Sequence, residues 1–474
     1  MEARYLTTTL PYVNADPHVG HALEFIEADC SARALRARDL NVFLNIGTDE
    51  HGAKIAEKAI EAHKEPQAYV DEYAERFKSF ADALDISYDS FIRTTDPHHL
   101  LAAQEFWKRC AAAGDIYKAA YELKYCVGCE LEKTDSELVD GRCPLHPNQP
   151  IEIRTEENYY FRFSKYQRAL LDHYQKQPDF VVPEERMREL ISFVSGGLKD
   201  FSISRRKEKL SWGIPVPGDD EHVMYVWFDA LINYVSAIGW PNHPERFGQW
   251  WPVTQFAGKD NLRQQAAMWQ AMLLSAGLPL SKQIFIHGFI TSGGQKMSKS
   301  LGNVIDPLDL VRAYGVDAVR YILLRHISPF EDSDLTPDAA REYYTAHLTN
   351  GLGNLVARVM KLAEDNLPRP IVWPDKSAFP GDYWGLIDTY RYPEALDLVF
   401  NRIQKLDERI TREEPFKVVK QDAMKGHELI RSLVTELYWI ARLLNPFMPR
   451  TSEAIKRAAL ENKKPENLFP RLAK

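Results

Sequence analysis

Thr9-Leu10-Pro11-Tyr12-Val13-Asn14-Ala15-Asp16-Pro17-His18-Val19-Gly20-His21 is the stretch that decides the fold. The apolar residues Tyr5–Leu10 indicate a short strand that runs into it, and the amphipathic residues from about His21 to Arg38 indicate a long helix that leaves it. A strand, a polar turn and the beginning of a helix form a geometry that binds phosphate. The unpaired backbone N–H groups and the positive end of the helix dipole both face such a ligand.

Two histidines in this stretch, His18 and His21, are three residues apart and therefore share one side of the first helical turn. The missing side chain of Gly20 between them is expected to let a flat ring approach the backbone. Histidines at a helix start are also common as surface or capping residues. The stretch alone leaves both interpretations open.

Length and composition narrow the class of protein. The chain has 474 residues, more than one ordinary core holds, so two to four domains are expected. It is 45% hydrophobic and 27% charged, as in a soluble globular enzyme. Its 59 basic and 67 acidic residues give a net charge of −8, which argues against binding nucleic acid by bulk charge but leaves room for a local basic groove.

The compartment is expected to be the cytoplasm. No apolar run reaches the ~18 residues that span a bilayer, and Met1–Arg4 does not begin a signal peptide. Three of the five cysteines cluster, which favours metal thiolates in a reducing compartment over disulfides.

Strand and helix patterns alternate after the first helix. Asn41–Gly47 reads as a buried strand, followed by Thr48-Asp49-Glu50-His51-Gly52 and then by helical periodicity. This alternation predicts a parallel sheet with helices on its faces, and ligands bind such sheets at the carboxyl ends of the strands. Asp49 and His51 are therefore expected to share a cleft with His18 and His21.

A different composition begins near Ile116. Cys126-Val127-Gly128-Cys129 and Cys143-Pro144-Leu145-His146, which thirteen residues separate, supply three thiolates and one imidazole. Four such ligands suit a closed, tetrahedral, structural zinc site, and the alternative is four unrelated polar residues in a loop. Cys30 and Cys110 lie in helical patterns and read as core residues.

The α/β pattern then resumes. A strand leading into a helix is expected at Val223–Ala230, and further strands at Phe256–Asp260 and Ile284–Ile290, so the cysteine-bearing segment interrupts one sheet. Gly293–Asn303 follows as a glycine-flanked loop. Its Lys296, Ser298 and Lys299 suit a polyphosphate, although a solvated basic turn is also possible.

Everything after Asp306 is expected to be helical, with apolar spacings of three and four at Leu335–Asp365, Ala395–Arg412, Phe416–Asn445 and Arg450–Leu460. We therefore expect five parts. They are the first half of an α/β domain (1–115), an insertion (116–222) with a zinc knuckle (126–146), the second half (223–292), a loop and connecting region (293–333), and a helical domain (334–474).

His18-Val19-Gly20-His21 resembles the HIGH signature of class I aminoacyl-tRNA synthetases, and Lys296-Met297-Ser298-Lys299-Ser300 is an unaltered KMSKS signature. The Leu-Pro-Tyr-Val-Asn lead-in, Gly47–Gly52, Tyr225–Ala230 and the Cys-Cys-Cys-His knuckle are similar to the methionyl-tRNA synthetase family. The resemblance covers nearly the whole chain. It implies a Rossmann-type parallel sheet interrupted by a zinc-bearing insertion and followed by an all-α anticodon-binding bundle.

The resemblance also implies an activity. This family activates L-methionine with ATP, with Mg²⁺ on the pyrophosphate, and transfers it to the 3′-terminal adenosine of tRNA(Met). Positioning and charge stabilisation suffice for such chemistry. The implied catalytic residues are His18, His21, Lys296 and Lys299. The implied ATP-binding residues are Asn14, His18, Gly20, His21, Asp260, His287, Gly288, Lys296, Ser298 and Lys299, with Gly288 expected to let adenine lie close to the backbone.

The resemblance further implies a methionine pocket lined by Leu10, Tyr12, Asp49, Arg205, Trp227, Ala230, Tyr234, Asn261 and Gln265. Asp49 would bind the ammonium group, and Arg205 would pair with Asp49 or with the substrate carboxylate. The run Asp260-Asn261-Leu262-Arg263-Gln264-Gln265 departs from the family, which places an aliphatic residue and a histidine at 261 and 265. Two extra amides in the pocket require hydrogen-bond partners.

Asn350, Asn354 and Arg358 follow one helix face and match the anticodon-reading positions of the family, with Phe416 where a tryptophan is usual. A phenyl ring still stacks on a base. A polar face packed against a neighbouring helix is the alternative. The chain ends soon after the bundle, without the appended domain that makes some family members dimers, so a monomer is expected.

Two rival functions remain at this point. One is a class I ligase that adenylates another small amino acid, and pyrophosphate exchange across the amino acids would identify it. The other is a tRNA-binding paralogue without catalysis, whose mark would be eroded signatures. Both signatures here keep every charged residue.

Overall fold

The computed structural model describes residues 3–126, 131–133, 138, 141–144, 147–296, 305–372 and 381–472, with backbone alone at 121–125, 131–133, 154–155 and 296. Its centre is a six-stranded, wholly parallel sheet with the strand order β3-β2-β1-β12-β13-β7. The strands are β1 (Ala3–Thr8), β2 (Asn41–Thr48), β3 (Ser90–Arg93), β7 (Val181–Val182), β12 (Val253–Gly258) and β13 (Gln283–His287). The predicted interrupted parallel sheet is thus confirmed.

The strand order reverses between β1 and β12. The chain proceeds outward through β2 and β3 on one side of β1, and through β13 on the other side of β12. At such a switch point the two neighbouring loops part and leave a crevice at the carboxyl ends of the strands. The stretch that decides the fold leaves β1 at this crevice.

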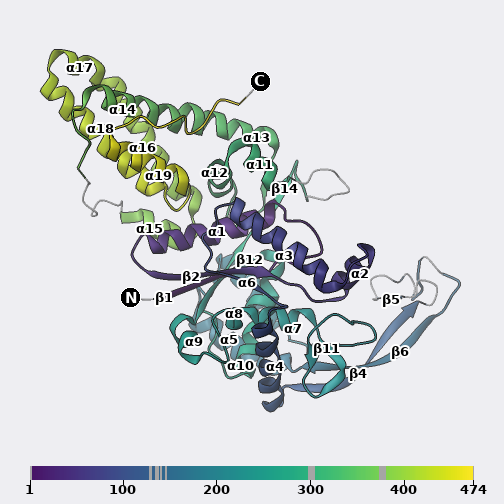
Figure 1. The fold of residues 1–474 in the computed structure, drawn as a ribbon. Coiled ribbons are helices and arrows are strands. Elements are labelled where there is room, and N and C mark those ends of the chain that lie inside the picture. Colours follow the sequence, from purple (N-terminus) through teal and green to yellow (C-terminus); the bar gives the residue numbers. More distant parts are fainter. Residues whose placement is uncertain are drawn as a thin grey trace.

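Helices cover both faces of the sheet (Figure 1). In that view one face carries α1 (Val19–Arg36) and α3 (Pro66–Ala83), and the opposite face carries α4 (Pro97–Ala112) and α10 (Trp269–Ser275). α2 (Ala53–Glu61), α7 (Val226–Leu231), α8 (Asn233–Ser236) and α9 (Pro244–Trp250) complete this part. Short 3₁₀ and π turns follow β12 at Lys259–Asn261 and Gln264–Met268.

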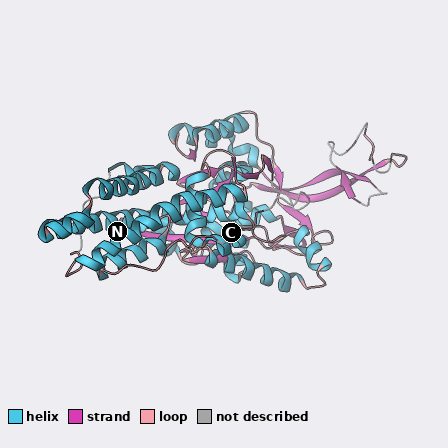
Figure 2. Ribbon diagram, turned by 90° about the horizontal axis from the view of Figure 1, so that it is seen from above, coloured by secondary structure: helices cyan, strands magenta, loops and turns pink. Residues whose placement is uncertain are grey.

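The insertion is an antiparallel arm. β4 (Ile116–Cys126) pairs along its whole length with β6 (Ile151–Phe161), and β5 (Leu131–Lys133) and β8 (Phe201–Ser202) flank them. The arm projects from the body, at the right of Figure 2. After a 3₁₀ turn at Phe163–Tyr166, α5 (Gln167–Lys176) and α6 (Glu184–Ser195) lead the chain back, and β7 between them joins the main sheet.

The strand that leads into a helix near Val223–Ala230 is present, but it does not belong to the main sheet. β11 (Asp219–Met224) belongs to a small antiparallel sheet with β9 (Ser204–Arg206) and β10 (Pro215–Val216). The helix α7 begins directly afterwards, at Val226, because the chain turns at Tyr225. An apolar run of this length does not distinguish a strand from a buried helix.

The rest of the chain is almost entirely helical, as expected. It comprises α11 (Pro307–Tyr314), α12 (Val316–His326), α13 (Pro337–Tyr343), a π-helix (Tyr344–Gly353), α14 (Asn354–Asn366), α15 (Gly381–Asp388), α16 (Tyr392–Glu413), α17 (Pro415–Gln421), α18 (Ala423–Leu444) and α19 (Pro449–Glu461). No described helix has both the length and the apolar character to cross a bilayer.

Two details of this helical region differ from expectation. A two-residue strand, β16 (Ser333–Asp334), pairs with β14 (Ile290–Ser292), which also pairs with β15 (Gln295–Lys296). The helix expected at Phe416–Asn445 is two helices, because the extended backbone of Asp422 ends α17 and its side chain caps α18 by accepting from the N–H of Lys425.

A buried arginine on α12 joins the helical region to α1. The guanidinium of Arg320 forms an ion pair with the buried Asp29 at 2.6 Å. It also donates to three backbone carbonyls, those of Leu84, Pro446 and Phe447. Although burial raises the pKa of Asp29, the charges of Arg320 and Arg33 lower it below its ordinary value. The bundle is thus held by charge as well as by a continuous apolar core with α1.

Glu27 of α1 lies in the same contact region and is fully buried. Among the described residues neither of its carboxylate oxygens has a hydrogen-bond partner. Burial is the main cause that raises its pKa to about 8, with His287 opposing and Glu24 adding to the rise. Glu27 is therefore protonated at neutral pH, and raising the pH puts an uncompensated charge inside the protein.

We expect Glu27 to make the protein less stable as the pH rises. A group with a folded-state pKa above its ordinary value of 4.5 binds more protons in the folded state, so stability falls between about pH 4.5 and about pH 8. Glu27→Gln should therefore raise the melting temperature relative to wild type at pH 8.5 and much less at pH 5. A difference in melting temperature that is the same at both pH values would contradict this.

Candidate active site

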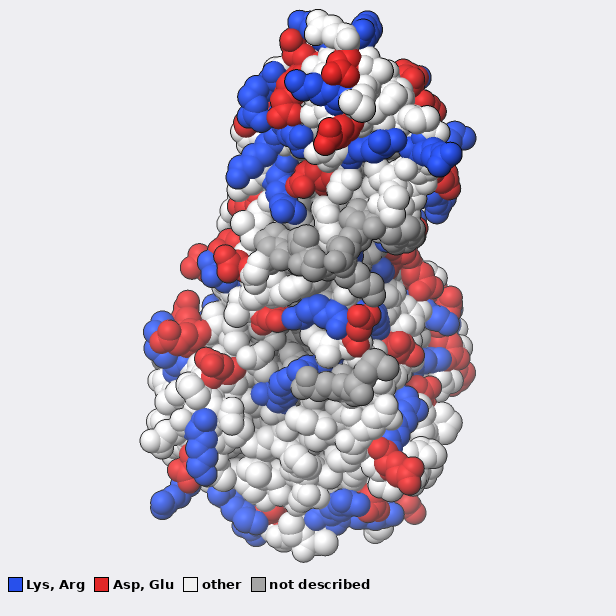
Figure 3. Space-filling model, turned by 90° about the vertical axis from the view of Figure 1, so that its left-hand side faces the viewer, with Lys and Arg blue, Asp and Glu red and all other residues white. Residues whose placement is uncertain are grey.

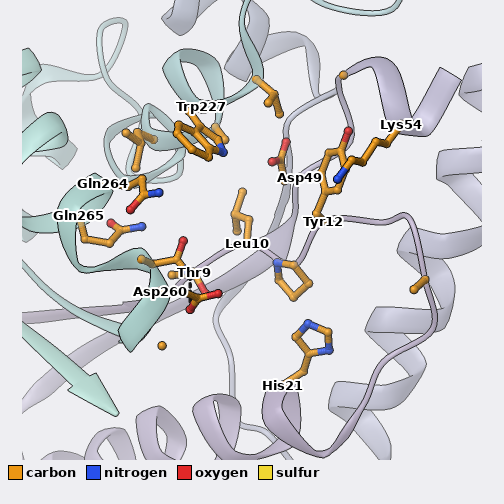
Figure 4. Close-up of a pocket in the computed structure, with 18 of the residues that line it drawn as sticks. Thr9, Leu10, Tyr12, His21, Asp49, Lys54, Trp227, Asp260, Gln264 and Gln265 are labelled. Atoms are coloured by element: carbon orange, nitrogen blue, oxygen red, sulfur yellow. Dashed lines mark hydrogen bonds between the residues drawn. The ribbon is translucent and has the colours of Figure 1, made fainter. Parts of the chain in front are cut away.

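A cavity of about 1980 Å³ opens at the carboxyl ends of β1 and β12. Figure 4 shows that its walls come from both halves of the sheet, with Tyr12 and Asp49 on one side, Gln264, Gln265 and Asp260 on another, and His21 below. The arm supplies a further wall with residues such as Glu156 and Asn158. Residues from both halves of the interrupted sheet therefore meet at this cavity.

The histidines His18 and His21 lie face to face, with ring centroids 3.8 Å apart. The Nδ1 atom of His18 accepts from the N–H of Gly20 at 3.1 Å, and that of His21 accepts from the N–H of His18 at 3.2 Å. Since each Nδ1 accepts, each ring carries its hydrogen on Nε2. Desolvation, and then the charge of His18, lower the pKa of His21 well below its ordinary value, so His21 is neutral.

Gly20 has a different role from the one expected. A Cβ atom at this position would lie 3.0 Å from Cε1 of His18. The flat ring that approaches the backbone is thus the ring of His18 itself, which folds over the helix start as its cap. The capping and the functional interpretations of the two histidines are compatible, because the caps use Nδ1 and leave the hydrogen on Nε2.

Asp49 lies at the end of β2 and is held against the first loop by two backbone hydrogen bonds, to Pro11 and from Val13. Its side chain is buried at the cavity wall next to Asp229, and one carboxylate oxygen of each has no partner among the described residues. Burial, followed by the charge of Asp229, raises the pKa of Asp49. The Nδ1 atom of His51 lies 3.0 Å from a carboxylate oxygen of Asp229. Such a pair of acids suits a cationic ligand group.

Arg205 also lines the cavity, but its partners are not Asp49. It donates to the hydroxyl of Ser202 at 2.8 Å and the carbonyl of Ser204 at 2.7 Å, and its guanidinium lies 4.3 Å from the ring centre of Tyr225. The expected alternative of an Arg205–Asp49 pair is therefore wrong in this structure. Arg205 is instead held at the wall by its own strand.

The predicted apolar pocket residues come together. Leu10, Tyr12, Trp227, Ala230 and Tyr234 all line the cavity. Tyr234 is buried, whereas Trp227 is 44% exposed at the cavity wall. Of the two unusual amides, Asn261 donates to Asp260 at 3.2 Å, and Gln265 accepts from Gln255 at 2.7 Å. Both are thus supplied with partners.

His287, the last residue of β13, is buried at the cavity wall. It contacts the carbonyl of Gly288 through Nδ1 at 2.8 Å and the carboxylate of Glu24 through Nε2 at 3.0 Å. Both partners are acceptors, so both nitrogens carry hydrogen and the ring is cationic. Burial lowers the pKa of His287, but the hydrogen bond to Glu24 and the charge of that carboxylate oppose this, and the pKa is raised to about 9. Sequence reasoning missed Glu24, which reads as part of an amphipathic helix.

Gly288 lines the cavity, and the space where its side chain would lie is filled by protein backbone. A Cβ atom there would lie 2.2 Å from the carbonyl oxygen of Glu331. The missing side chain thus admits the backbone at 331–332, which returns from the helical region beside the cavity. Asp260 lines the cavity as predicted, whereas Asn14 lies in the turn and is not among the described lining residues.

Several predicted residues cannot be placed. Ser298 and Lys299 lie outside the described residues, and only the backbone of Lys296, at the end of β15, is described. For the knuckle, Cys126 at the end of β4 and Cys143 are both buried, while Cys129 and His146 lie outside the described residues. Within the described residues, no three potential metal ligands form a group.

The predicted anticodon residues also come together. Asn350, Asn354, Arg358 and Phe416 line a second cavity of about 1120 Å³ between the bundle helices. Asn354 donates to the carbonyl of Asn350 at 3.2 Å, and Arg358 pairs with Asp407 at 2.6 Å. Phe416 is 43% exposed. In Figure 3 positive and negative side chains intermingle over the upper, helical part, so bulk charge does not mark this surface.

Comparisons with known proteins agree on one family. The family model described as "tRNA synthetases class I (M)" matches residues 4–150 and 132–360. The methionine–tRNA ligase of Thermotoga maritima is 41% identical, covering 97% of this chain and 76% of that protein, and that of Nostoc sp. is 42% identical over 95% and 88%. The structure of Mycobacterium tuberculosis methionyl-tRNA synthetase in complex with methionyl-adenylate matches with a TM-score of 0.85 and 36% identity, covering 100% of this chain and 99% of that one.

Proposed function

Because the chain belongs to the methionyl-tRNA synthetases of class I, we propose that the cavity at the carboxyl ends of β1 and β12 binds methionine and ATP. The chain activates L-methionine with ATP to methionyl-adenylate and transfers the methionyl group to the 3′-terminal adenosine of tRNA(Met). In the first step a methionine carboxylate oxygen bonds to the α-phosphorus, and the bond to the β-phosphate oxygen breaks to release pyrophosphate.

The observation that carries the proposal is the meeting of an anion-binding end and a cation-binding end in one cavity. At the anion-binding end, His18 and His21 carry hydrogen on Nε2 at the start of α1, where the helix dipole also favours phosphate. At the cation-binding end stands Asp49, with the buried Asp229 next to it. A nucleotide triphosphate and an amino acid ammonium group need these two ends.

We assign the remaining roles by position. Lys296, Ser298 and Lys299 would hold the β- and γ-phosphates together with Mg²⁺, which neutralises their charge. Asp260 would bind the ribose, and His287 with Gly288 would border the adenine side. Leu10, Tyr12, Trp227, Ala230 and Tyr234 would enclose the methionine side chain, since aromatic rings suit a polarizable sulfur. Arg205 would face the substrate carboxylate.

Zinc is proposed for the knuckle in the arm. The supporting observation is that Cys126 and Cys143, far apart along the hairpin, are both buried in a small segment with little other apolar content. With Cys129 and His146 they would form a closed four-ligand set that stabilises the arm. We further propose the domain division 1–115, 116–222, 223–292, 293–333 and 334–474, a monomeric state and a cytoplasmic location.

The second cavity is proposed to bind the anticodon of tRNA(Met). Its amides from Asn350 and Asn354 and the guanidinium of Arg358 can hydrogen-bond base edges, and the half-exposed ring of Phe416 can stack on a base. The ion pair with Asp407 holds Arg358 at the rim of this cavity.

Two half-reactions test the two cavities separately. Asp49→Asn is expected to raise the KM for methionine ten- to a hundredfold in ATP–pyrophosphate exchange, because the ammonium group loses a charged partner, while the KM for ATP stays unchanged. Asn354→Ala should leave exchange intact and weaken tRNA charging. Wild-type protein that exchanges pyrophosphate with cysteine or leucine but not with methionine would refute the proposal.

A further inference from the structure

Three buried polar side chains stand behind Gln265, outside the cavity itself. They are Gln255 on β12, Gln270 on α10 and Ser281 just before β13, and each is at most 4% exposed. Buried amides cost free energy unless every polar atom finds a partner. Here they form one connected series of hydrogen bonds, the amide chain, which ends at Gln265.

The backbone fixes the orientation of the first amide. The N–H of Ser281 can only donate, and it lies 3.1 Å from one end of the Gln270 amide, so that end is the oxygen. The carbonyl of Gln265 can only accept, and it lies 2.8 Å from the other end, so that end is the nitrogen. Gln270 therefore has one allowed orientation.

The orientation is passed on through a serine. The amide nitrogen of Gln270 also donates to the hydroxyl of Ser281 at 3.1 Å. That hydroxyl lies 2.6 Å from Gln255, a length typical of O–H···O and short for N–H···O, so the oxygen of Gln255 faces it and accepts. The nitrogen of Gln255 then points at Gln265 and donates to its oxygen at 2.7 Å.

The amide chain thus determines which end of the Gln265 amide faces the ligand. Its oxygen is occupied by Gln255, so its NH₂ group is the end on the cavity side, as Figure 4 shows. Burial raises the pKa of the neighbouring Tyr234, and hydrogen bonding to the amides of Gln265 and Gln255 partly offsets the rise. This end of the pocket therefore offers N–H groups as donors. It suits a ligand group that accepts a hydrogen bond, and not one that donates.

We propose that Gln255, Ser281 and Gln270 are positioning residues that hold Gln265 as a hydrogen-bond donor toward the substrate side chain. The proposal rests on the methionine pocket assigned above and adds the basis of its selectivity. A thioether sulfur can accept from an amide N–H, whereas the methylene group that replaces it in norleucine cannot. The amide chain would favour methionine over an apolar amino acid of the same length.

Gln255→Leu tests the proposal without touching the substrate. It removes the bond that Gln255 donates to Gln265 and the bond that it accepts from Ser281, so Gln265 can then turn its oxygen to the cavity. We expect kcat/KM for methionine in pyrophosphate exchange to fall about tenfold, the size of one hydrogen bond, while the value for norleucine changes less than twofold. The KM for ATP should stay the same. Gln283→Leu, the same change at the far end of β13, is the matched control and should leave both values unaltered.

Gln255→Glu gives a readout that a merely structural role would not produce. While the introduced carboxyl is protonated it can still donate to Gln265, but once ionised it can only accept and turns the amide round. The preference for methionine over norleucine should therefore fall with rising pH in this variant alone. Wild type titrated in parallel corrects for Tyr234 and Glu24, the other ionisable groups nearby.

The possible results separate the two proposals. If wild type shows no methionine-dependent exchange, the proposed function itself is wrong. If wild type shows it and the methionine-to-norleucine ratio is unchanged in Gln255→Leu, and independent of pH in Gln255→Glu, the amide chain has no role in selection. If Gln255→Leu does not fold, the nearly isosteric Gln255→Glu decides alone.

Discussion

Replacing Lys299 by alanine is expected to lower methionine-dependent pyrophosphate exchange by about a thousandfold, the size of effect seen when one preorganised charge is removed from a phosphoryl-transfer site. The reaction needs no covalent enzyme intermediate, so catalysis rests on placing positive groups where charge develops. The pKa of His21 is lowered, so its neutral ring contributes an N–H donor and no charge. We therefore expect the lysines of the Lys296–Ser300 signature to supply positive charge to the leaving pyrophosphate.

The matched control is Lys108→Ala, which removes an exposed lysine on α4. Both variants should keep the melting temperature of wild type and one zinc per chain by elemental analysis, because Lys108 is exposed and neither residue belongs to the knuckle sequence 126–146. Near-normal exchange in Lys299→Ala would remove that residue from the mechanism. A folded, metal-free wild type would refute the zinc site independently.

The sheet could be predicted from the sequence because its long strands are apolar runs that end in glycine or polar turns. Asn41–Gly47 and Phe256–Asp260 both read correctly in this way. β7 could not be predicted, because two residues carry no period and only their pairing with β13 makes them a strand. The same holds for β16, whose partner β14 lies some forty residues earlier.

Site residues could be predicted from the sequence where their chemistry depends on residue type. They could not be predicted where it depends on neighbours that the fold brings close. Two histidines and an aspartate in turn positions were enough to place the two ends of the cavity. What occupies the side-chain space beside Gly20 and Gly288 could not be predicted. A ring fills it at Gly20 and a backbone segment at Gly288, and only the fold brings them there. Gln255 and Gln270 were missed because a buried amide in an apolar run looks like an interruption of the pattern.

The burial of α1 could not be predicted from the sequence either. Its polar residues predict an amphipathic surface helix, yet Glu27 and Asp29 are buried because the helical bundle covers the face opposite the sheet. Charged residues in such a place need partners from the covering element. Asp29 finds Arg320, whereas Glu27 stays protonated instead.

Arg320→Met is expected to lower the free energy of unfolding by about 3–5 kcal/mol, which is the usual cost of removing one partner of a buried ion pair. The methionine side chain fills much of the space, so a cavity is a minor part of the loss. The main part is Asp29, which remains buried with one cation fewer, and the three carbonyls of Leu84, Pro446 and Phe447, which lose their donor. Chemical denaturation followed by tryptophan fluorescence measures the change.

Two further variants separate charge from packing. Arg33→Met removes the other, more exposed partner of Asp29, so it should cost clearly less than Arg320→Met. Combining Arg320→Met with Asp29→Leu should recover part of the loss, because the unpaired carboxylate disappears while the carbonyls still lack a donor. If the double variant is as unstable as the sum of its single variants, the ion pair contributes nothing and Arg320 acts through its carbonyl contacts alone.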